Sequence, residues 1–263
     1  MKKIFLTGAS SGIGRAIAQR LCAAGHEVWG TSRDPARIPS LGHLHPVRLD
    51  LAELAGIGAV FETAWREAGH FDVVINNAGG GHFDAAEILG PEKIEELFRT
   101  LVFAHIELCR LAFVAMNARQ SGLIINVTSL ASRLPVPFMS AYNAAKAAMA
   151  SYTFSLQLEL SDRQVRIVDL QPADICTSFN DSISPQPSDD ARVSKTWEVV
   201  QRNMQNAPPP DLVARRVLRL IESANPPPRV TVGDVFQSRI APLIFRFLPQ
   251  RVRVWGLKKY YGI

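Results

Sequence analysis

Tyr142 and Lys146 are the side chains whose types and spacing best suit proton transfer. They stand four residues apart, and Ser129 precedes the tyrosine by thirteen residues. Positions four apart share one face of a helix, so in a helix over residues 140–161 the phenol and the ammonium group would project into the same space. A phenol ionises near pH ~10, and a nearby ammonium group favours the phenolate and lowers that pKa. We therefore expect the phenol to exchange a proton with a substrate, although such a pair also occurs on solvated helix faces.

A second hydroxyl is expected at the same place. Residues 123–129 form an apolar run that reads as a buried strand, and Ser129 ends it. A hydroxyl at the end of such a strand can donate to a carbonyl oxygen that the tyrosine also contacts. The predicted catalytic residues are Ser129, Tyr142 and Lys146.

A glycine-rich stretch near the start of the chain has the pattern of a phosphate-binding turn. Residues 7–14 follow the short apolar strand 4–6 and open a helix that would stop at Gly25. Glycines let the backbone turn tightly and approach a pyrophosphate, whose charge the helix N-terminus favours. An ordinary strand-to-helix turn is the alternative. The residues predicted to bind a dinucleotide here are Gly8, Ser10, Ser11, Gly12, Ile13 and Gly14.

Together with two further motifs, these stretches resemble the short-chain dehydrogenase/reductase family in its simple one-domain form. The resemblance runs over residues 1 to about 178 and includes the motifs at 76–79 and 172–177. Alternating strand-like and helix-like stretches also call for a parallel sheet covered on both faces. The resemblance implies an α/β, doubly wound Rossmann fold with a seven-stranded parallel sheet in the order 3-2-1-4-5-6-7. We expect residues 1–263 to form this single domain.

The resemblance also implies a role for each motif. Tyr142 would be the general acid or base, Ser129 would orient the carbonyl oxygen, and Lys146 would lower the pKa of the tyrosine and hold the nicotinamide ribose. Small residues after the fourth strand would let the backbone lie against the nicotinamide side of the cofactor: Asn77, Ala78 and Gly79. A later loop would hold the nicotinamide amide through Pro172, Ile175 and Thr177. Near the adenine would lie Asp50 and Leu51, and Asp50 could also cap the helix that follows, since the two roles are not exclusive.

The end of the second predicted strand, 27–32, favours NADP(H) over NAD(H). Relatives that bind NAD carry an acidic residue about 20 residues past the glycines, which holds the ribose 2′-OH. Here Ser32 takes that place and Arg33 follows it. A small residue beside a guanidinium suits a 2′-phosphate. Asp34 is a competing candidate, but Asp34-Pro35 reads better as a turn.

Two positions depart from the family pattern. Leu101 stands in the long helix 91–116 where the family usually has an asparagine, which supports a water-filled proton route to the catalytic lysine. Ala173 replaces a glycine of the 172–177 motif. Leucine cannot play the polar part of asparagine, so we expect proton resupply to be slow.

Composition bounds the remaining possibilities. The net charge of +5 is mild for a nucleic-acid-binding protein, and no partner of that kind is expected. The cysteines Cys22, Cys109 and Cys176 are an odd number and far apart, so they read as reduced thiols. The histidines show no metal-ligand spacing, and no run approaches the ~18 apolar residues of a membrane span. We expect a cytoplasmic homodimer or homotetramer without a metal site.

Two segments near the end of the sequence bear on the substrate and on partners. Residues 178–210 are too long for an idle connection, and in the family this region forms a variable lid over the substrate. Residues 235–263 mix apolar side chains with six cations and no acidic residue, a pattern that can lie on anionic lipid, pack on a partner subunit or wall the substrate pocket.

The sequence thus predicts an NADP(H)-dependent oxidoreductase that moves a hydride between the nicotinamide and a hydrophobic ketone or secondary alcohol. Two alternatives remain. One is a catalytically weak dinucleotide-binding regulatory or scaffold protein, and the other is a peripheral membrane protein.

Overall fold

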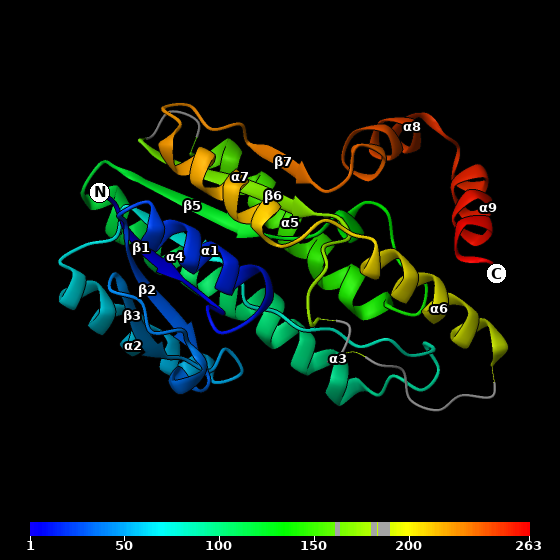
Figure 1. Ribbon diagram of the computed structural model, residues 1–263, viewed down its shortest axis with the longest axis horizontal. Coiled ribbons are helices and arrows are strands. Elements are labelled where there is room, and N and C mark those ends of the chain that lie inside the picture. The colour runs from blue at the N-terminus through cyan, green and yellow to red at the C-terminus, as the bar shows by residue number, and fades with distance from the viewer. Residues whose placement is uncertain (161–163, 180–182, 184–189) are drawn as a thin grey trace.

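Seven strands form one parallel sheet in the order β3-β2-β1-β4-β5-β6-β7, as predicted (Figure 1). The computed structural model describes residues 1–160, 164–179, 183 and 190–263. All the strand pairs are parallel, and the order reverses between β1 and β4. The strands are β1 Lys3–Leu6, β2 Glu27–Ser32, β3 Leu44–Arg48, β4 Val73–Asn76, β5 Gly122–Val127, β6 Val165–Pro172 and β7 Arg229–Val232.

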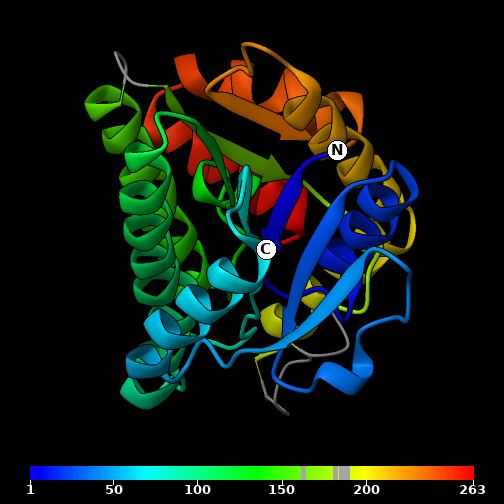
Figure 2. The same ribbon diagram turned by 90° about the vertical axis from the view of Figure 1, so that its left-hand side faces the viewer.

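Helices cover both faces of this sheet (Figure 2). The α-helices are α1 Gly12–Ala23, α2 Leu54–Ala68, α3 Pro91–Phe98, α4 Ala104–Ala118, α5 Ser140–Glu159, α6 Ala191–Gln205, α7 Asp211–Glu222, α8 Ala241–Phe247 and α9 Gln250–Tyr261. Short 3-10 turns occupy η1 Pro35–Arg37 and η3 Leu130–Ser132, and π-helical turns occupy η2 Arg99–Phe103 and η5 Phe236–Ile240.

The alternation of side chains along β1 builds two separate cores. Ile4 and Leu6 point to the face covered by α1 and α7, while Phe5 points to the face covered by α2 and α4. All three side chains are fully buried. Successive residues of a strand face opposite sides, so a parallel strand covered on both sides must be apolar throughout.

The long predicted helix is present, but a π-helical turn interrupts it. α3, η2 and α4 form one continuous run, Pro91–Ala118, that by length and composition could cross a membrane, although the sequence analysis expected no such span. Two residues of this run, Leu108 and Met116, are fully buried in the core that contains Phe5. Leu101 is fully buried in a further cluster, which it shares with residues of α5. The run therefore serves as a core helix.

Several predicted boundaries were wrong by a few residues. The apolar pattern predicts a third strand from Pro46, but β3 begins at Leu44, because residues 44–48 pair with Val28–Ser32 of β2. The pattern likewise predicts a fourth strand from Phe71, whereas β4 begins at Val73. Helix α5 ends at Glu159, and residue 161, its predicted end, lies outside the described part. The predicted lid, 178–210, contains helix α6, which begins after Asp190 because that carboxylate accepts from the Arg192 amide at 2.8 Å. Residues 180–182 and 184–189 of the lid lie outside the described residues.

The turn between β1 and α1 tolerates nothing larger than glycine at two positions. Gly8 has φ +75°, and a Cβ placed there would lie 2.9 Å from the Ala78 Cα. A Cβ on Gly14 would lie 2.0 Å from the Gly8 carbonyl oxygen. The first turn of α1 thus packs directly on the backbone of the loop that precedes it.

We expect Gly14→Ala to destabilise the protein by about 1–3 kcal/mol, because the backbone must move to admit the methyl group. Gly56→Ala is the matched control: it lies in α2 with nothing within 4 Å of the new Cβ, and it should stabilise by about 0.5–1 kcal/mol. Thermal melts of both variants test this. Equal melting temperatures would show that the turn relaxes at no cost.

Candidate active site

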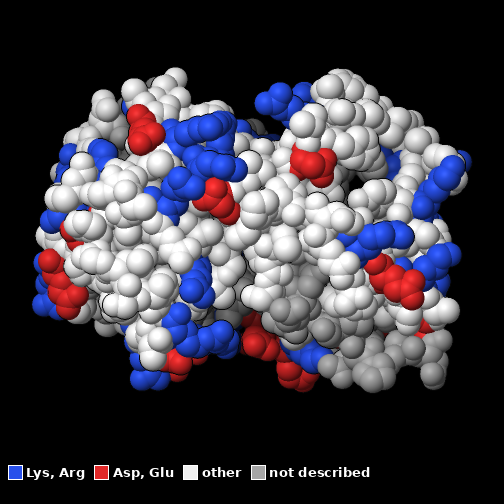
Figure 3. Space-filling model, viewed as in Figure 1, with Lys and Arg blue, Asp and Glu red and all other residues white. Residues whose placement is uncertain are grey.

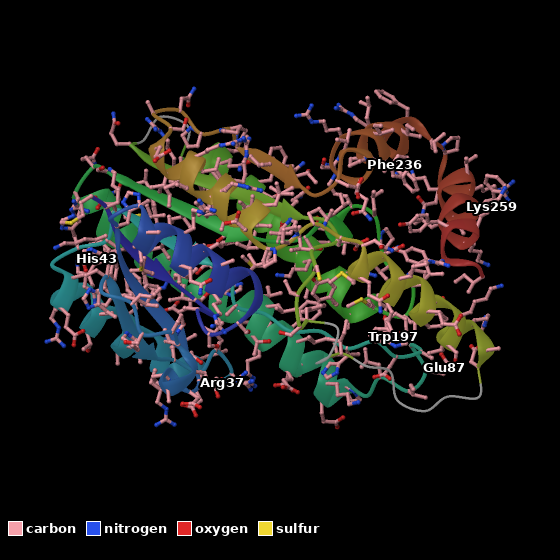
Figure 4. All side chains as sticks on the ribbon, viewed as in Figure 1. Arg37, His43, Glu87, Trp197, Phe236 and Lys259 are labelled. Carbon is pink, nitrogen blue, oxygen red and sulfur yellow. The ribbon has the colours of Figure 1, made fainter. Side chains whose placement is uncertain are left out.

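The predicted functional residues meet at the carboxyl edge of the sheet, where parallel strands end side by side. β1 leads into the glycine turn, β4 into residues 77–79, β5 into Ser129, and β6 into residues 173–177. The strand order reverses between β1 and β4. Such a reversal is the usual place for a ligand in an open α/β sheet. Figure 4 shows Arg37 at one end of this edge and Trp197 of α6 toward the other.

Ser129 and Tyr142 are hydrogen-bonded to each other. The Ser129 Oγ accepts from the Ala131 amide at 3.0 Å, which fixes the hydroxyl and leaves its hydrogen to be donated to the Tyr142 phenol. Helix α5 holds the phenol opposite the end of β5, because the first turn of α5 is tied back by the Asn143 Nδ2, which donates to the Val136 carbonyl at 2.8 Å. The two hydroxyls are therefore positioned to share one oxygen of a bound substrate.

Lys146 lies one turn further along α5 and is 4% exposed. Its Nζ donates to the Val127 carbonyl at the end of β5 at 3.0 Å and lies 5.9 Å from the centroid of the Tyr142 ring. Burial lowers the pKa of Lys146 to about 8, and the carboxylate of Asp169 opposes that shift. The ammonium group is thus fixed beside the phenol, and its charge is sensitive to mildly alkaline pH.

The expected lowering of the Tyr142 pKa is not found. The phenol pKa is raised, chiefly because protein atoms crowd the hydroxyl and desolvate it. The hydrogen bond from Ser129 favours the phenolate, and the charge of Asp174 disfavours it. Sequence reasoning counted the neighbouring ammonium group but could not count burial, and burial outweighs the other effects in this arrangement.

Thr7 joins the glycine turn to the loop after β4, a role that the sequence analysis did not assign. Its Oγ1 accepts from the amides of Asn77 and Ala78 at 2.8 and 3.0 Å, and its carbonyl accepts from the Asn77 side chain at 2.9 Å. A Cβ on Gly79 would lie 2.9 Å from the Leu101 Cδ2 and 3.8 Å from the Lys146 Nζ. Residues 77–79 therefore run between the glycine turn and Lys146.

The loop after β6 closes over the same turn. Thr177 lies above the start of α1, where a Cβ on Gly12 would be 3.7 Å from the Thr177 Cβ, and Ile175 anchors the loop in the core. Pro172 ends β6 opposite Val232. The chain thus brings the predicted nicotinamide-binding loop to the glycine turn.

The departure at Ala173 has a compensating residue. A Cβ on Gly233 would lie 2.6 Å from the Ala173 Cβ, so the methyl group of Ala173 occupies the space beside a glycine on the neighbouring strand end. The Ala173 amide donates to the Val232 carbonyl at 2.7 Å. Alanine at position 173 therefore fits without disturbing the loop.

At the predicted adenine end, Ser32 ends β2 and Arg33 follows it on the surface. The Ser32 Oγ donates to the Ser10 Oγ at 3.2 Å, and Arg33 is exposed. Asp34 directs its carboxylate to the Ala36 amide at 3.1 Å, as expected for a turn. The end of β2 thus presents a guanidinium, while its carboxylate is engaged locally.

Asp50 and Leu51 follow β3, and the prediction that Asp50 also caps a helix is wrong. Helix α2 begins only at Leu54. The Asp50 carboxylate instead closes a small turn by accepting from the Ala52 amide at 3.0 Å, and Leu51 is buried.

An apolar cluster covers the side of the site next to Tyr142. The tyrosine ring lies 5.8 Å from that of Phe179, and Phe83 lies 4.9 Å from Trp197 of α6. The same cluster takes in side chains from the end of α9. These contacts make an apolar wall beside the two hydroxyls: Phe83, Met139, Phe179, Ile183, Trp197, Leu257 and Tyr261.

Leu101 is a fully buried core residue within the π-helical turn η2. One turn later lies His105, which the sequence analysis singled out only to reject as a metal ligand. It is 2% exposed and hydrogen-bonded to the Leu101 carbonyl, and its Nε2 has no partner among the described residues. The sequence did contain a signal for His105, because it stands one helical turn after Leu101, the position that departs from the family pattern.

Comparison with known proteins agrees with this geometry. The family described as short chain dehydrogenase matches residues 2–188. The 3-ketodihydrosphingosine reductase of Bacteroides thetaiotaomicron is 29% identical over 266 residues, covering 99% of this chain and 98% of that protein. The NADPH-dependent 1-acyldihydroxyacetone phosphate reductase of Saccharomyces cerevisiae is 28% identical over 274 residues, covering 98% and 89%. A solved short-chain dehydrogenase from Streptomyces avermitilis has a TM-score of 0.82 at 26% identity, covering 98% of this chain and 96% of that chain.

We expect Tyr142→Phe to lower kcat by about 10²–10⁴-fold, because it removes the proton donor and little else. The dinucleotide affinity of this variant should stay within a few-fold of the wild type. Lys146→Ala should lower both kcat and the dinucleotide affinity. Steady-state kinetics and fluorescence titration with the dinucleotide measure the two effects. Appreciable turnover by the phenylalanine variant would show that another acid serves.

We also expect kcat/KM for carbonyl reduction to fall as pH rises through about 8, because Lys146 then loses its proton. Below that pH the ammonium group is charged, and the Tyr142 phenol holds its proton to a higher pH since its pKa is raised. Asp169, His105 and Tyr142 are the titratable groups that face the ammonium group from β6, α4 and α5. A rate that stays flat well into the alkaline range would contradict this assignment.

Proposed function

Since this chain belongs to the short chain dehydrogenase family of oxidoreductases, which act on alcohol and carbonyl groups, we propose that it reduces an apolar, long-chain ketone with NADPH. The observation that carries the proposal is the pair of hydrogen-bonded hydroxyls, Ser129 and Tyr142, set beside a buried ammonium group and an apolar wall. The pair suits a carbonyl oxygen, and the wall suits an alkyl chain.

The residues at the sheet edge fit a dinucleotide. The glycine turn has no room for a Cβ at Gly14 and takes a positive φ at Gly8 and Gly12, as a backbone does where it approaches a pyrophosphate closely. At the other end, Arg33 is exposed and the nearest carboxylate, that of Asp34, is engaged in a turn. A guanidinium without a competing carboxylate favours a 2′-phosphate.

In the proposed mechanism the chain supplies positioning and a proton. The bound dinucleotide would supply the hydride. Once a ketone is bound, the Ser129 hydroxyl donates its hydrogen to the carbonyl oxygen instead of to the phenol, and Tyr142 donates to the same oxygen. As that oxygen gains charge, the Tyr142 proton moves onto it. The Lys146 ammonium group, held by the Val127 carbonyl, stabilises the phenolate that remains. The raised pKa of Tyr142 keeps the phenol protonated, which suits the reductive direction.

The apolar substrate class is supported by the side chains around the phenol and by the relatives. Phe179 and Trp197 belong to the wall beside Tyr142, and they come from the lid. The Bacteroides and yeast proteins are named as reductases of a ketodihydrosphingosine and an acyldihydroxyacetone phosphate, and both names describe ketones on lipid molecules.

The outer faces of α4 and α5 support a homodimer or homotetramer as a further part of the proposal. Val114 of α4, Phe154 of α5 and Phe103, which ends η2 directly before α4, are exposed, each by half or more. A cytoplasmic location is also proposed, and the free thiols of Cys22, Cys109 and the exposed Cys176 support it.

The cofactor assignment is tested by Arg33→Ala. Removing the guanidinium should raise KM for NADPH by about tenfold or more and leave KM for NADH within a factor of two, because only the former carries the 2′-phosphate. Arg66→Ala, an exposed arginine of α2 remote from this edge, is the control. Equal wild-type affinity for NADH and NADPH would refute the assignment.

The substrate class is tested with a series of methyl ketones of increasing alkyl length. If the apolar wall receives the chain, kcat/KM should rise by up to about fourfold per added methylene, which is the value of burying one such group. The oxidation of NADPH is followed by absorbance. A flat series would remove the long-chain assignment, and wild-type protein that binds NADPH but oxidises none with any ketone would favour the regulatory or scaffold alternative.

A further inference from the structure

The tail, residues 235–263, carries a disproportionate share of the exposed apolar surface. Ten of the seventeen exposed large apolar side chains in the described part of the chain lie in it. Those at 236, 240, 243, 244 and 247 recur at helical spacing across η5 and α8, so they form one stripe, and Phe247 is 75% exposed. Concentrated apolar surface of this kind marks an interaction site. The ten are Val235, Phe236, Ile240, Leu243, Ile244, Phe247, Val252, Val254, Trp255 and Tyr260.

The same tail is entirely basic. It holds six cations and no Asp or Glu, and Figure 3 shows Lys and Arg at the edge of the molecule where α9 lies. Two cations sit beside exposed aromatic rings: the Arg246 guanidinium is 5.9 Å from the Phe247 centroid, and the Lys259 Nζ is 5.3 Å from that of Trp255. Amphipathic cations next to aromatic rings suit a boundary between water and an apolar phase.

The tail is held firmly on its inner side. Leu257 and Tyr261 of α9 pack into the apolar wall of the site, and the Asn203 side chain of α6 donates to the Tyr260 hydroxyl at 2.9 Å. Arg253 is turned inward and donates to the Leu248 carbonyl at 2.7 Å. Figure 4 shows Phe236 at the base of α8 and Lys259 directed away from the body on α9. One face of the tail thus belongs to the fold and the other is presented to a partner.

Charge selects between the two partners that could cover this face. A second copy docked through the same surface about a two-fold axis would bring the five exposed cations of one tail against the five of the other, with no acidic residue of the tail to separate them. An anionic surface meets the same cations with opposite charge, and a bilayer also accepts the Phe236–Phe247 stripe.

We propose that the tail docks this protein on an anionic lipid bilayer, with the α8 stripe inserted at the headgroup boundary and the cations of α9 on the headgroups. The surface lies next to the substrate site, because the residues that anchor α9 belong to the same cluster as Tyr142. A ketone carried by a bilayer lipid would then be presented beside the cluster that contains the phenol, a consequence that rests on the proposed function.

Co-sedimentation of the full chain with vesicles tests the docking without any turnover. Vesicles of phosphatidylcholine mixed with phosphatidylglycerol should bind the protein, vesicles of phosphatidylcholine alone should bind it far less, and high salt should release it. Arg251→Gln combined with Lys259→Gln should weaken binding about thirtyfold, at about 5.5-fold for each cation lost from the anionic surface. Phe247→Asp should weaken it further. Arg66→Gln and Ile88→Asp, an exposed cation and an exposed apolar residue elsewhere, should bind like the wild type.

Two results would overturn the docking proposal. One is equal binding of the wild type to neutral and anionic vesicles, or none to either. The other is a dimer in sedimentation velocity that Phe247→Asp dissociates while vesicle binding is absent, since that would assign the face to a second copy. If vesicles bind but no ketone is reduced, the proposed function fails and the docking stands. If both hold, Phe247→Asp should lose turnover of a vesicle-borne ketone and keep that of a water-soluble one.

An independent observation concerns His105, whose Nε2 is buried without a partner among the described residues. The ring donates to the Leu101 carbonyl, so the hydrogen is on Nδ1 and Nε2 presents a lone pair. Buried polar atoms without partners are rare and costly. The charge of Lys146 acts on this ring and, with burial, lowers its pKa to about 3, so the ring stays neutral at working pH.

We infer that His105 is a positioning residue for Lys146, with Nε2 accepting a hydrogen bond from the ammonium group through a water molecule. The acceptor lies one helical turn from Leu101, so it can support the lysine although leucine itself is apolar. Leu101 of the π-helical turn η2 packs against Ala145 and Met149 of α5, and the Lys146 charge on α5 acts on the His105 ring.

His105→Leu tests this inference, with His105→Gln as the conservative variant that keeps an acceptor. The leucine variant should move the alkaline limb of kcat/KM to lower pH and alter the solvent isotope effect on kcat, and glutamine should restore both. Adding Leu101→Asn to the leucine variant should also restore them, by supplying an amide from the preceding turn. If the leucine variant folds, as judged by its melt, and its pH limb and isotope effect match the wild type, His105 is only a core residue.

Discussion

The rest of the site depends on the buried ammonium group of Lys146, because neighbouring residues must compensate its charge. A charge taken out of water is costly unless hydrogen bonds and opposite charge compensate it. Here the end of β5 provides the Val127 carbonyl, and Asp169 on β6 provides a carboxylate that is 1% exposed. Asp169 is in turn held by Gln171 at 2.8 Å and Arg229 at 2.9 Å, so the support for one ammonium group reaches the last strand of the sheet.

The second constraint is that several chain segments approach one another closely. At each of these contacts one residue is a glycine, which has no Cβ to clash. The glycine turn packs on α1 at Gly14, the loop after β4 passes Leu101 and Lys146 at Gly79, and β7 passes Ala173 at Gly233. These contacts bring loops from four strands to one edge without room for side chains between them. The surface left over is backbone, which is what a dinucleotide needs along its length.

The proposed substrate recognition and the proposed docking would both use the segment after β6. Helix α6 contributes Trp197 to the wall beside Tyr142, and α9 contributes Tyr261 to the same wall while its outer face carries cations. Because one side of this segment contacts the site and the other side is exposed, it would link the proposed docking on a membrane to the entry of the substrate. In Figure 1 the two tail helices stand out from the body beyond β7, with α9 beside α6.

The sequence alone determined the fold class, the strand order and the positions that meet at the sheet edge, because those depend on local periodicity and on motifs whose glycines and polar residues have fixed spacing. β2 has the predicted bounds, and residues 8–14, 77–79, 129, 142, 146 and 172–177 lie at the same edge of the sheet. The tertiary structure decided what depends on contacts between distant residues. It showed that burial raises the pKa of Tyr142, that Gly233 makes room for Ala173, and that the Nε2 of His105, one turn after Leu101, is buried without a partner among the described residues. Desolvation, close approach and orphaned hydrogen-bonding atoms are properties of packed neighbours, and spacing along one chain does not contain them.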